Sequence, residues 1–141
     1  MKLAHSLALL VVTAFTMHSA LANFHVVQLV KGAGYTQGVI ACPSNYLNCN
    51  CFAKKERGAD IGLQNFPDDF FSTKQNLCGE GVMNFYNRGG GHWEFFQKDG
   101  DSKPLGNCWT PDNPPHWKCG STPTSPGAVT KLICNSYICG S

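Results

Sequence analysis

Three polar residues near the middle of the chain have the types needed for proton transfer beside an anion. His92 and Glu94 are two residues apart in an aromatic-rich run, and Arg88 precedes them across three glycines. Residues two apart in a strand share one face, so His92 and Glu94 are expected side by side, with Arg88 close by. Such a cluster could supply the base, the acid and the cation of a hydrolytic reaction. The commoner origin of this spacing is a polar surface on a β-hairpin, and both interpretations stay open.

The second candidate site is a proline-rich segment between two cysteines. Trp109 and Trp117 flank the sequence Thr-Pro-Asp-Asn-Pro-Pro-His, and Cys108 and Cys119 lie just outside it. If these cysteines pair, the segment becomes a stiff loop, and a preorganised loop binds a partner at a small entropic cost. The alternative is a purely structural surface loop. The candidate binding residues are Trp109, Pro111, Asp112, Asn113, Pro114, Pro115, His116 and Trp117.

Aromatic residues and metal-binding side chains suggest two further kinds of site. The tryptophans and tyrosines could form a sugar-stacking platform, although aromatic residues of small disulfide-rich domains lie more often in the core. A zinc site that combines the clustered cysteines with His25 or His116 is the alternative to disulfides, and export from the cell argues against it. No motif of a metal-dependent or nucleotide-dependent enzyme occurs, so we expect no cofactor and no metal.

The first residues indicate export from the cell. Lys2 precedes an apolar run over residues 7–15, and the Ala-Leu-Ala sequence at residues 20–22 is typical of a signal-peptide cleavage site. We therefore predict a signal peptide over residues 1–22 and a single secreted, extracellular domain over residues 23–141. The apolar run is too short to span a membrane. With a net charge of +2 the chain has no polybasic surface, so we expect neither a membrane nor a nucleic acid as partner.

Eight cysteines follow the predicted cleavage site, and in an exported chain this number predicts four disulfides. Their spacing does not give the pairing, because eight cysteines can combine in many ways. Cys49 and Cys51 fall in a segment predicted to be extended, so they are expected to bond different partners. The cysteines are Cys42, Cys49, Cys51, Cys78, Cys108, Cys119, Cys134 and Cys139.

Short strands separated by turn residues are predicted for most of the domain. Pro67, the acidic residues that follow it and Gly79 predict one short helix over residues 67–77. The charged run at 54–58 and the segments 110–116 and 121–127 are predicted as surface turns. This order favours a mainly β fold, a small disulfide-stabilised antiparallel β-sandwich or barrel with at most one short helix. The predicted strands cover residues 24–30, 39–41, 46–53, 82–86, 92–97, 105–109 and 128–134.

Three cysteine-containing segments carry a resemblance to a known class. They are Ala-Cys-Pro-Ser-Asn-Tyr at residues 41–46, Asn-Cys-Asn-Cys-Phe at 48–52 and Cys-Asn-Ser-Tyr-Ile-Cys-Gly at 134–140. With the export signal and the eight cysteines, the chain resembles small cysteine-rich secreted proteins of filamentous fungi. Members of this class that act on plants are effectors: some inhibit host proteases, some bind chitin, and others act against competing microbes. The resemblance implies a virulence role of this kind.

Three functions are compatible with these observations. The first is a monomeric effector that uses residues 109–117 to make stoichiometric contact with a host extracellular protein. Such a target could be a papain-like protease, which the contact would inhibit. The second is a small secreted hydrolase, similar to a ribonuclease, that uses His92, Glu94 and Arg88. The third is an antimicrobial or carbohydrate-binding protein with a glycan as partner. We favour the first, because the chain has several features that present a loop and no convincing catalytic set.

Overall fold

The computed structural model describes residues 22–31 and 35–140, which form one antiparallel sheet of nine strands. The 3-10 turn η1 (Ser44–Tyr46) and the short helix α1 (Cys49–Lys54) follow the second strand. The predicted mainly β, disulfide-stabilised fold is confirmed, whereas the predicted signal peptide lies outside the described residues except for Ala22. The strands are β1 (Ala22–Lys31), β2 (Tyr35–Pro43), β3 (Ala59–Asp60), β4 (Phe70–Ser72), β5 (Met83–Gly89), β6 (His92–Gln97), β7 (Gly106–Trp109), β8 (His116–Lys118) and β9 (Gly127–Asn135).

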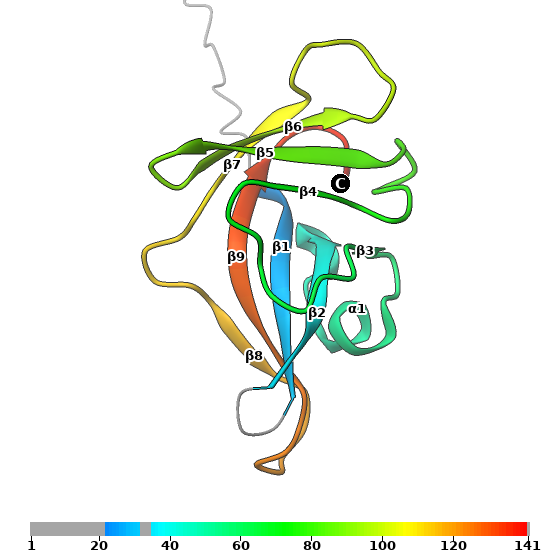
Figure 1. Cartoon of the computed structure of the whole chain (residues 1–141). Helices are drawn as coiled ribbons and strands as arrows, with labels where there is room; N and C mark the ends of the chain where they lie inside the picture. The colour runs from blue at the N-terminus through cyan, green and yellow to red at the C-terminus, as the bar shows by residue number, and fades with distance from the viewer. Residues whose placement is uncertain (1–21, 32–34, 141) are drawn as a thin grey trace, which may run out of the picture.

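The sheet curls over itself into a half-barrel. Its strands follow the order β3-β2-β1-β9-β7-β6-β5-β4, and β8 pairs with β9 beside this path. In Figure 1, β4, β5 and β6 cross the upper ends of β1 and β9 at a steep angle. The inner face of the curled sheet therefore encloses a core without a second sheet.

Two apolar clusters lie on opposite faces of β1 and β2. Val26 belongs to the larger cluster, inside the curl, and its neighbour Val27 belongs to the smaller one, as expected for alternating residues of a strand. The register of β1 against β9 shifts between these two valines. This irregularity lets β9 supply Leu132 to the larger cluster and Ala128 to the smaller one, although the two residues are an even number of positions apart.

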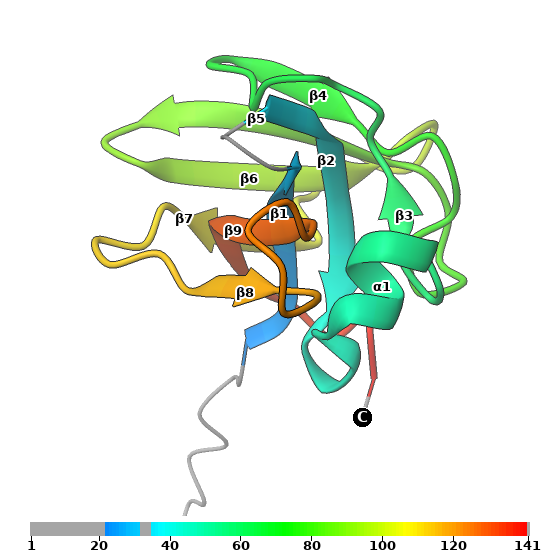
Figure 2. The same ribbon diagram turned by 90° about the horizontal axis from the view of Figure 1, so that it is seen from below.

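The smaller cluster is covered by the helix and by β8. Phe52 of α1 is 3% exposed and lies in this cluster, and Trp117 of β8 packs against it. Figure 2, seen from below, shows α1 beside β2 and β8 beside β9. The helix α1 and strand β8 thus protect the outer face of β1 and β2 from water.

Part of the segment predicted as a helix over residues 67–77 is a strand, so that prediction is wrong. Strand β4 pairs antiparallel with β5. Phe71 is buried and stacks on Phe85 with the ring centroids 4.4 Å apart, whereas Phe70 points outward. Burial of an aromatic ring against another in the core outweighs the weak local helix signal that begins at Pro67.

The strand predicted over residues 46–53 is also wrong, because this segment forms the end of η1 and most of α1. The side chain of Asn48 accepts hydrogen bonds from the backbone N–H groups of Asn50 and Cys51, at 2.9 and 3.4 Å. Lys55 ends the helix in the left-handed conformation, with φ of 56°. The helix is therefore set by its caps, and Asn48 is the sequence signal that would have indicated its start.

The remaining strand predictions agree with β1, β2, β5, β6, β7 and β9. Strands β3, β4 and β8 were not predicted. Each has only two or three residues, which is too short for an alternating pattern to be recognised. The last of them begins at His116, which the sequence placed at the end of a loop.

All eight cysteines are paired, which confirms the prediction of four disulfides. Cys49 and Cys51 bond different partners, as predicted, although they belong to a helix and not to a strand. The Cys108–Cys119 disulfide that would have closed the proline-rich loop is not formed. The pairs are Cys42–Cys51, Cys49–Cys119, Cys78–Cys139 and Cys108–Cys134.

Candidate functional site

The proline-rich loop joins two strands that lie end to end along one edge of β9. Strand β7 pairs with residues 133–135 of β9 and β8 pairs with residues 127–129, while β1 pairs along the opposite edge. Residues 110–115 bridge the gap between β7 and β8 (Figure 1). In this loop Pro111 and Pro114 are half-buried, and Asp112, Asn113 and Pro115 are exposed.

The first end of the loop is fixed by a disulfide and a hydrogen bond. Cys108 of β7 is bonded to Cys134, the residue directly opposite in β9. Two residues later, the backbone N–H of Thr110 donates to the carbonyl oxygen of Gly91, at 2.9 Å. The loop therefore leaves the sheet next to the turn between β5 and β6.

The second end of the loop is fixed in the same way. The backbone N–H of Thr130 in β9 donates to the carbonyl oxygen of Pro115, at 3.0 Å. Beyond β8, Cys119 is bonded to Cys49 of α1. The stiffness that a Cys108–Cys119 disulfide would have given is thus provided by two separate disulfides, one on each side of the loop.

The two tryptophans that flank the loop have different surroundings. Trp109 is 44% exposed and stacks on the imidazole ring of His92, with the centroids 5.3 Å apart. Trp117 is half-buried, and its ring lies 5.2 Å from the ring of Phe52. Trp117 therefore anchors β8 to the helix, and of the two tryptophans Trp109 presents more surface to a partner.

The residues of the predicted catalytic cluster lie near one another on β5 and β6. The Nε–H of Arg88 donates to Oε2 of Glu94 at 2.7 Å. Nε2 of His92 lies 2.9 Å from Oδ1 of Asn107 in β7. The acid is thus paired with the cation, and the imidazole with an amide. Trp93, between them in sequence, is 2% exposed and belongs to the core.

Aromatic rings continue the same outer surface across β5 and β4. Tyr86 lies directly opposite Glu94 in β6 and Phe70 in β4, and its ring centroid is 5.0 Å from that of Phe70. The guanidinium of Arg88 lies 5.6 Å from the centre of the Tyr86 ring. The ring of Phe96 also lies against Tyr86, with the centroids 5.7 Å apart. Phe70 is 49% exposed and Tyr86 36%.

We name this surface the contact face. It combines both sequence-predicted candidate sites, because His92 stacks on Trp109 and so joins the polar cluster to the loop. Phe70 and Phe96 were not predicted as site residues. The alternation of β6, which places Phe96 on the face of His92 and Glu94, would have indicated Phe96, whereas no local pattern indicated Phe70. The contact face consists of the loop 110–115 and of Phe70, Tyr86, Arg88, His92, Glu94, Phe96 and Trp109.

The outer surface next to Trp109 extends across two further strands to a half-buried histidine. Trp109 lies opposite Ile133 of β9, which lies opposite His25 of β1. Burial lowers the pKa of His25 below its usual value of 6.5, and its Nδ1 has no hydrogen-bond partner. Loss of solvation disfavours the charged imidazolium, so His25 is held neutral to a lower pH than an exposed histidine.

Two classes of feature are not found in the part of the chain that the structure describes. Residues 22–31 and 35–140 contain no group of three or more histidines, cysteines and acids that could hold a metal ion. No helix within these residues is long and apolar enough to cross a membrane.

Comparisons of the chain with models of protein families, with curated proteins and with solved structures gave no match.

Proposed function

We propose that this protein is a secreted binding protein that makes stoichiometric contact with an extracellular host protein through the contact face. The proposed role is that of a fungal effector, and the proposed class of target is an extracellular enzyme such as a papain-like protease, which the contact would inhibit. One observation carries the proposal: a proline-rich loop, held by a separate disulfide on each side, lies beside the exposed ring of Trp109.

The composition of the contact face supports a protein partner. Tryptophan, tyrosine and arginine are the residue types that most often dominate the binding energy of protein interfaces. Here Trp109, Tyr86 and Arg88 occur on one surface, and the guanidinium already lies over the tyrosine ring. Rings of this kind offer a large contact area at little conformational cost, because they have few rotatable bonds.

The rigidity of the loop supports the same proposal. Ordering a flexible loop on binding costs roughly 0.5–1.5 kcal/mol for each side chain that is immobilised. Residues 110–115 contain three prolines, and hydrogen bonds from Thr110 and to Pro115 tie the two ends to neighbouring strands. Much of the ordering cost is therefore met when the chain folds and not when it binds.

The hydrogen bonds of the polar cluster favour contact over catalysis. A general base has to reach the proton that it removes, and a general acid has to reach the leaving group. Nε2 of His92 is already paired with Asn107, and Glu94 is paired with Arg88. A hydrolytic reaction would have to use the other ring nitrogen of His92 and the other carboxylate oxygen of Glu94, whereas binding can use the same residues as they stand.

The proposal is tested by capture from the extracellular fluid of a candidate plant host. The bait is the oxidised protein, recovered after secretion from an expression host, and the first control is the reduced and alkylated protein. In a second bait, residues 110–115 are replaced by a Gly-Ser sequence of the same length. Its matched control carries the same kind of replacement at residues 121–124, an exposed loop outside the contact face.

The proposal predicts a protein captured at 1:1 stoichiometry by the oxidised protein and by the 121–124 control. The 110–115 variant and the reduced protein should not retain it. Equal capture by the 110–115 variant would contradict the assignment to the contact face. If folded bait captures no protein but binds chitin or degrades RNA, the glycan-binding or the hydrolase hypothesis would replace the proposal.

A further inference from the structure

A pocket that shares no residue with the contact face opens where β1 ends and β2 begins. Its volume is about 400 Å³, within the range of about 300–1,000 Å³ that small-molecule sites occupy. The walls come from β1, β2, α1, the residue after β8 and the start of β9. Its lining includes Leu29, Lys31, Gln37, Phe52, Ala53 and Pro126.

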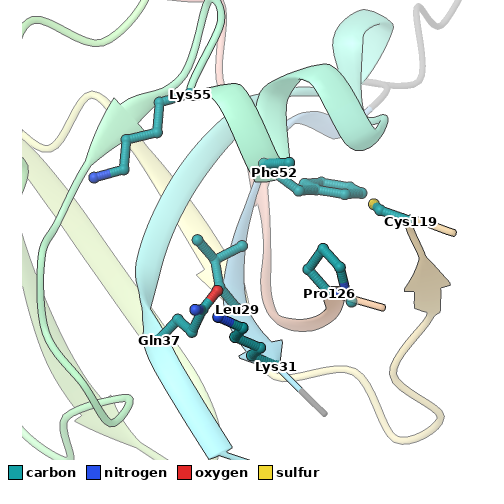
Figure 3. A pocket seen from close by; sticks show the side chains of 9 residues that line it. Leu29, Lys31, Gln37, Phe52, Lys55, Cys119 and Pro126 are labelled. Atoms are coloured by element: carbon teal, nitrogen blue, oxygen red, sulfur yellow. The ribbon is translucent and has the colours of Figure 1, made fainter. Parts of the chain in front are cut away.

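Apolar groups form one side of this pocket. Phe52 belongs to the smaller apolar cluster, and Leu29 packs against that cluster. Figure 3 shows the side chains of Phe52, Leu29 and Pro126 around the same opening. The pocket is therefore an open end of the apolar cluster, and an apolar molecule bound there would extend the cluster and lose contact with water.

The charged groups of the pocket are two lysines, and its described lining contains no carboxylate. Nζ of Lys55 pairs with Oδ2 of Asp60 at 2.7 Å, and the side chain extends away from Phe52 in Figure 3. Lys31, at the exposed end of β1, forms no ion pair with another described residue. Gln37 lies beside Lys31 in the same view and adds an amide that can donate a hydrogen bond.

We propose that this pocket binds a small amphipathic anion, a molecule with an apolar body and one carboxylate. The apolar body lies against Phe52, Leu29 and Pro126, and the carboxylate is directed to Lys31 and Gln37. This ligand uses both properties of the pocket, since a wholly apolar molecule would gain nothing from Lys31 and a small inorganic anion would not cover the apolar wall. The binding is independent of the proposed function, because the contact face includes none of these residues.

The first test is a titration of the isotope-labelled, oxidised protein with hexanoate, octanoate and decanoate, followed by NMR at concentrations below micelle formation. Saturable shifts are expected at the amide signals of Phe52, Ala53 and Gly127. Each added methylene that enters the pocket should tighten binding by about two- to fourfold. A parallel titration with 2-naphthoate distinguishes a ring-shaped apolar body from an alkyl chain.

The second test compares two exposed lysines. Lys31→Gln should weaken decanoate binding by about two- to fivefold, as expected for one solvent-exposed charge pair. Lys118→Gln, in β8 and outside the pocket lining, should leave it unchanged. Ala53→Trp places a large ring at the pocket and should abolish binding; if this variant does not fold, the lysine pair still decides the question.

Three results would overturn the proposal. One is the lack of saturable binding by any of the carboxylates. Another is equal affinity for decanoate and the uncharged decanol, which would remove the role of the anion. The third is the same loss of affinity in Lys118→Gln as in Lys31→Gln, which would indicate general charge attraction and not a site.

Discussion

Gly106 is a position at which one added methyl group should destabilise the strand that carries Trp109. A Cβ atom at Gly106 would overlap the backbone carbonyl oxygen of Asn135 and lie 2.8 Å from two carbons of the Phe95 ring. Real Cβ atoms essentially never approach other atoms closer than 3.0 Å. The oxygen belongs to the backbone of β9 and Phe95 is fully buried, so neither can move aside without disturbing the packed core.

Two opposing effects set the size of the change in Gly106→Ala. Forcing an extra carbon into a packed site costs about 1–3 kcal/mol. Replacing glycine by alanine also restricts the unfolded chain, which stabilises the fold by about 0.4–1 kcal/mol where the backbone conformation is compatible. Because the first effect is larger, we expect the free energy of unfolding to fall by about 1–2 kcal/mol.

The measurement is urea unfolding of the oxidised protein, followed by tryptophan fluorescence. The slope m of the free energy against urea concentration should be the same in variant and wild type if only stability has changed. Gly140→Ala is the matched control, because a Cβ there meets no atom within 4 Å. Its free energy of unfolding should stay within about 0.5 kcal/mol of the wild type. If Gly106→Ala is as stable as Gly140→Ala, the close approach of β7 and β9 at Asn135 is refuted.

Three further perturbations test other parts of the structure. Replacing both Cys49 and Cys119, which are 70 residues apart, by serine should lower the free energy of unfolding by about 4 kcal/mol, because the disulfide restricts the unfolded chain. A loss below about 1 kcal/mol in urea unfolding would contradict a stabilising role of this disulfide. Because burial lowers the pKa of His25 below 6.5, the unfolded chain binds the proton first as the pH falls. The contribution of this group to stability is therefore complete above its unfolded pKa and is lost as the pH falls from there to the lower folded pKa. His25→Gln should remove that part of the decline between pH 7.5 and pH 5 in urea unfolding. An identical pH dependence in the variant would contradict the lowered pKa of His25. Trp93→Ala, at a position 2% exposed, should cost about 3–5 kcal/mol, whereas Trp109→Ala, at a position 44% exposed, should cost about 1 kcal/mol or less; equal losses in thermal or urea unfolding would contradict the difference in burial.

Regular alternation made most of the sheet predictable, and short or locally ambiguous segments were missed. The strand around Val26 is long and rich in β-branched residues. It could therefore be recognised from the sequence although its register against β9 shifts. The segment after Pro67 has the end signals of a helix, but Phe71 finds a stacking partner in Phe85 that only the folded sheet provides. Around Asn48 the reverse occurred, because a capping side chain set a helix in a segment whose residues favour strands.

The members of the candidate site were predicted better than their arrangement. Residue types and their spacing grouped His92, Glu94 and Arg88 together, and Trp109 with the loop. The two groups form one surface because β6 pairs with β7 and places His92 opposite Trp109. This register cannot be predicted from the local sequence of either strand. The disulfide partners of Cys108 and Cys119 depend on β9 and α1 in the same way, and cysteine spacing could not supply them.

The most direct test of the contact face is the affinity between the host protein captured by the wild type and single-residue variants of this chain. Dissociation constants would be measured by isothermal titration calorimetry for the wild type, for Trp109→Ala and for Tyr137→Ala, a ring that is 86% exposed and lies outside the contact face. A tryptophan at the centre of an interface contributes about 2 kcal/mol or more, so Trp109→Ala should weaken binding by about 30-fold or more. Tyr137→Ala should stay within about twofold of the wild type. Unchanged affinity in Trp109→Ala, or an equal loss in Tyr137→Ala, would contradict the assignment of binding to the contact face.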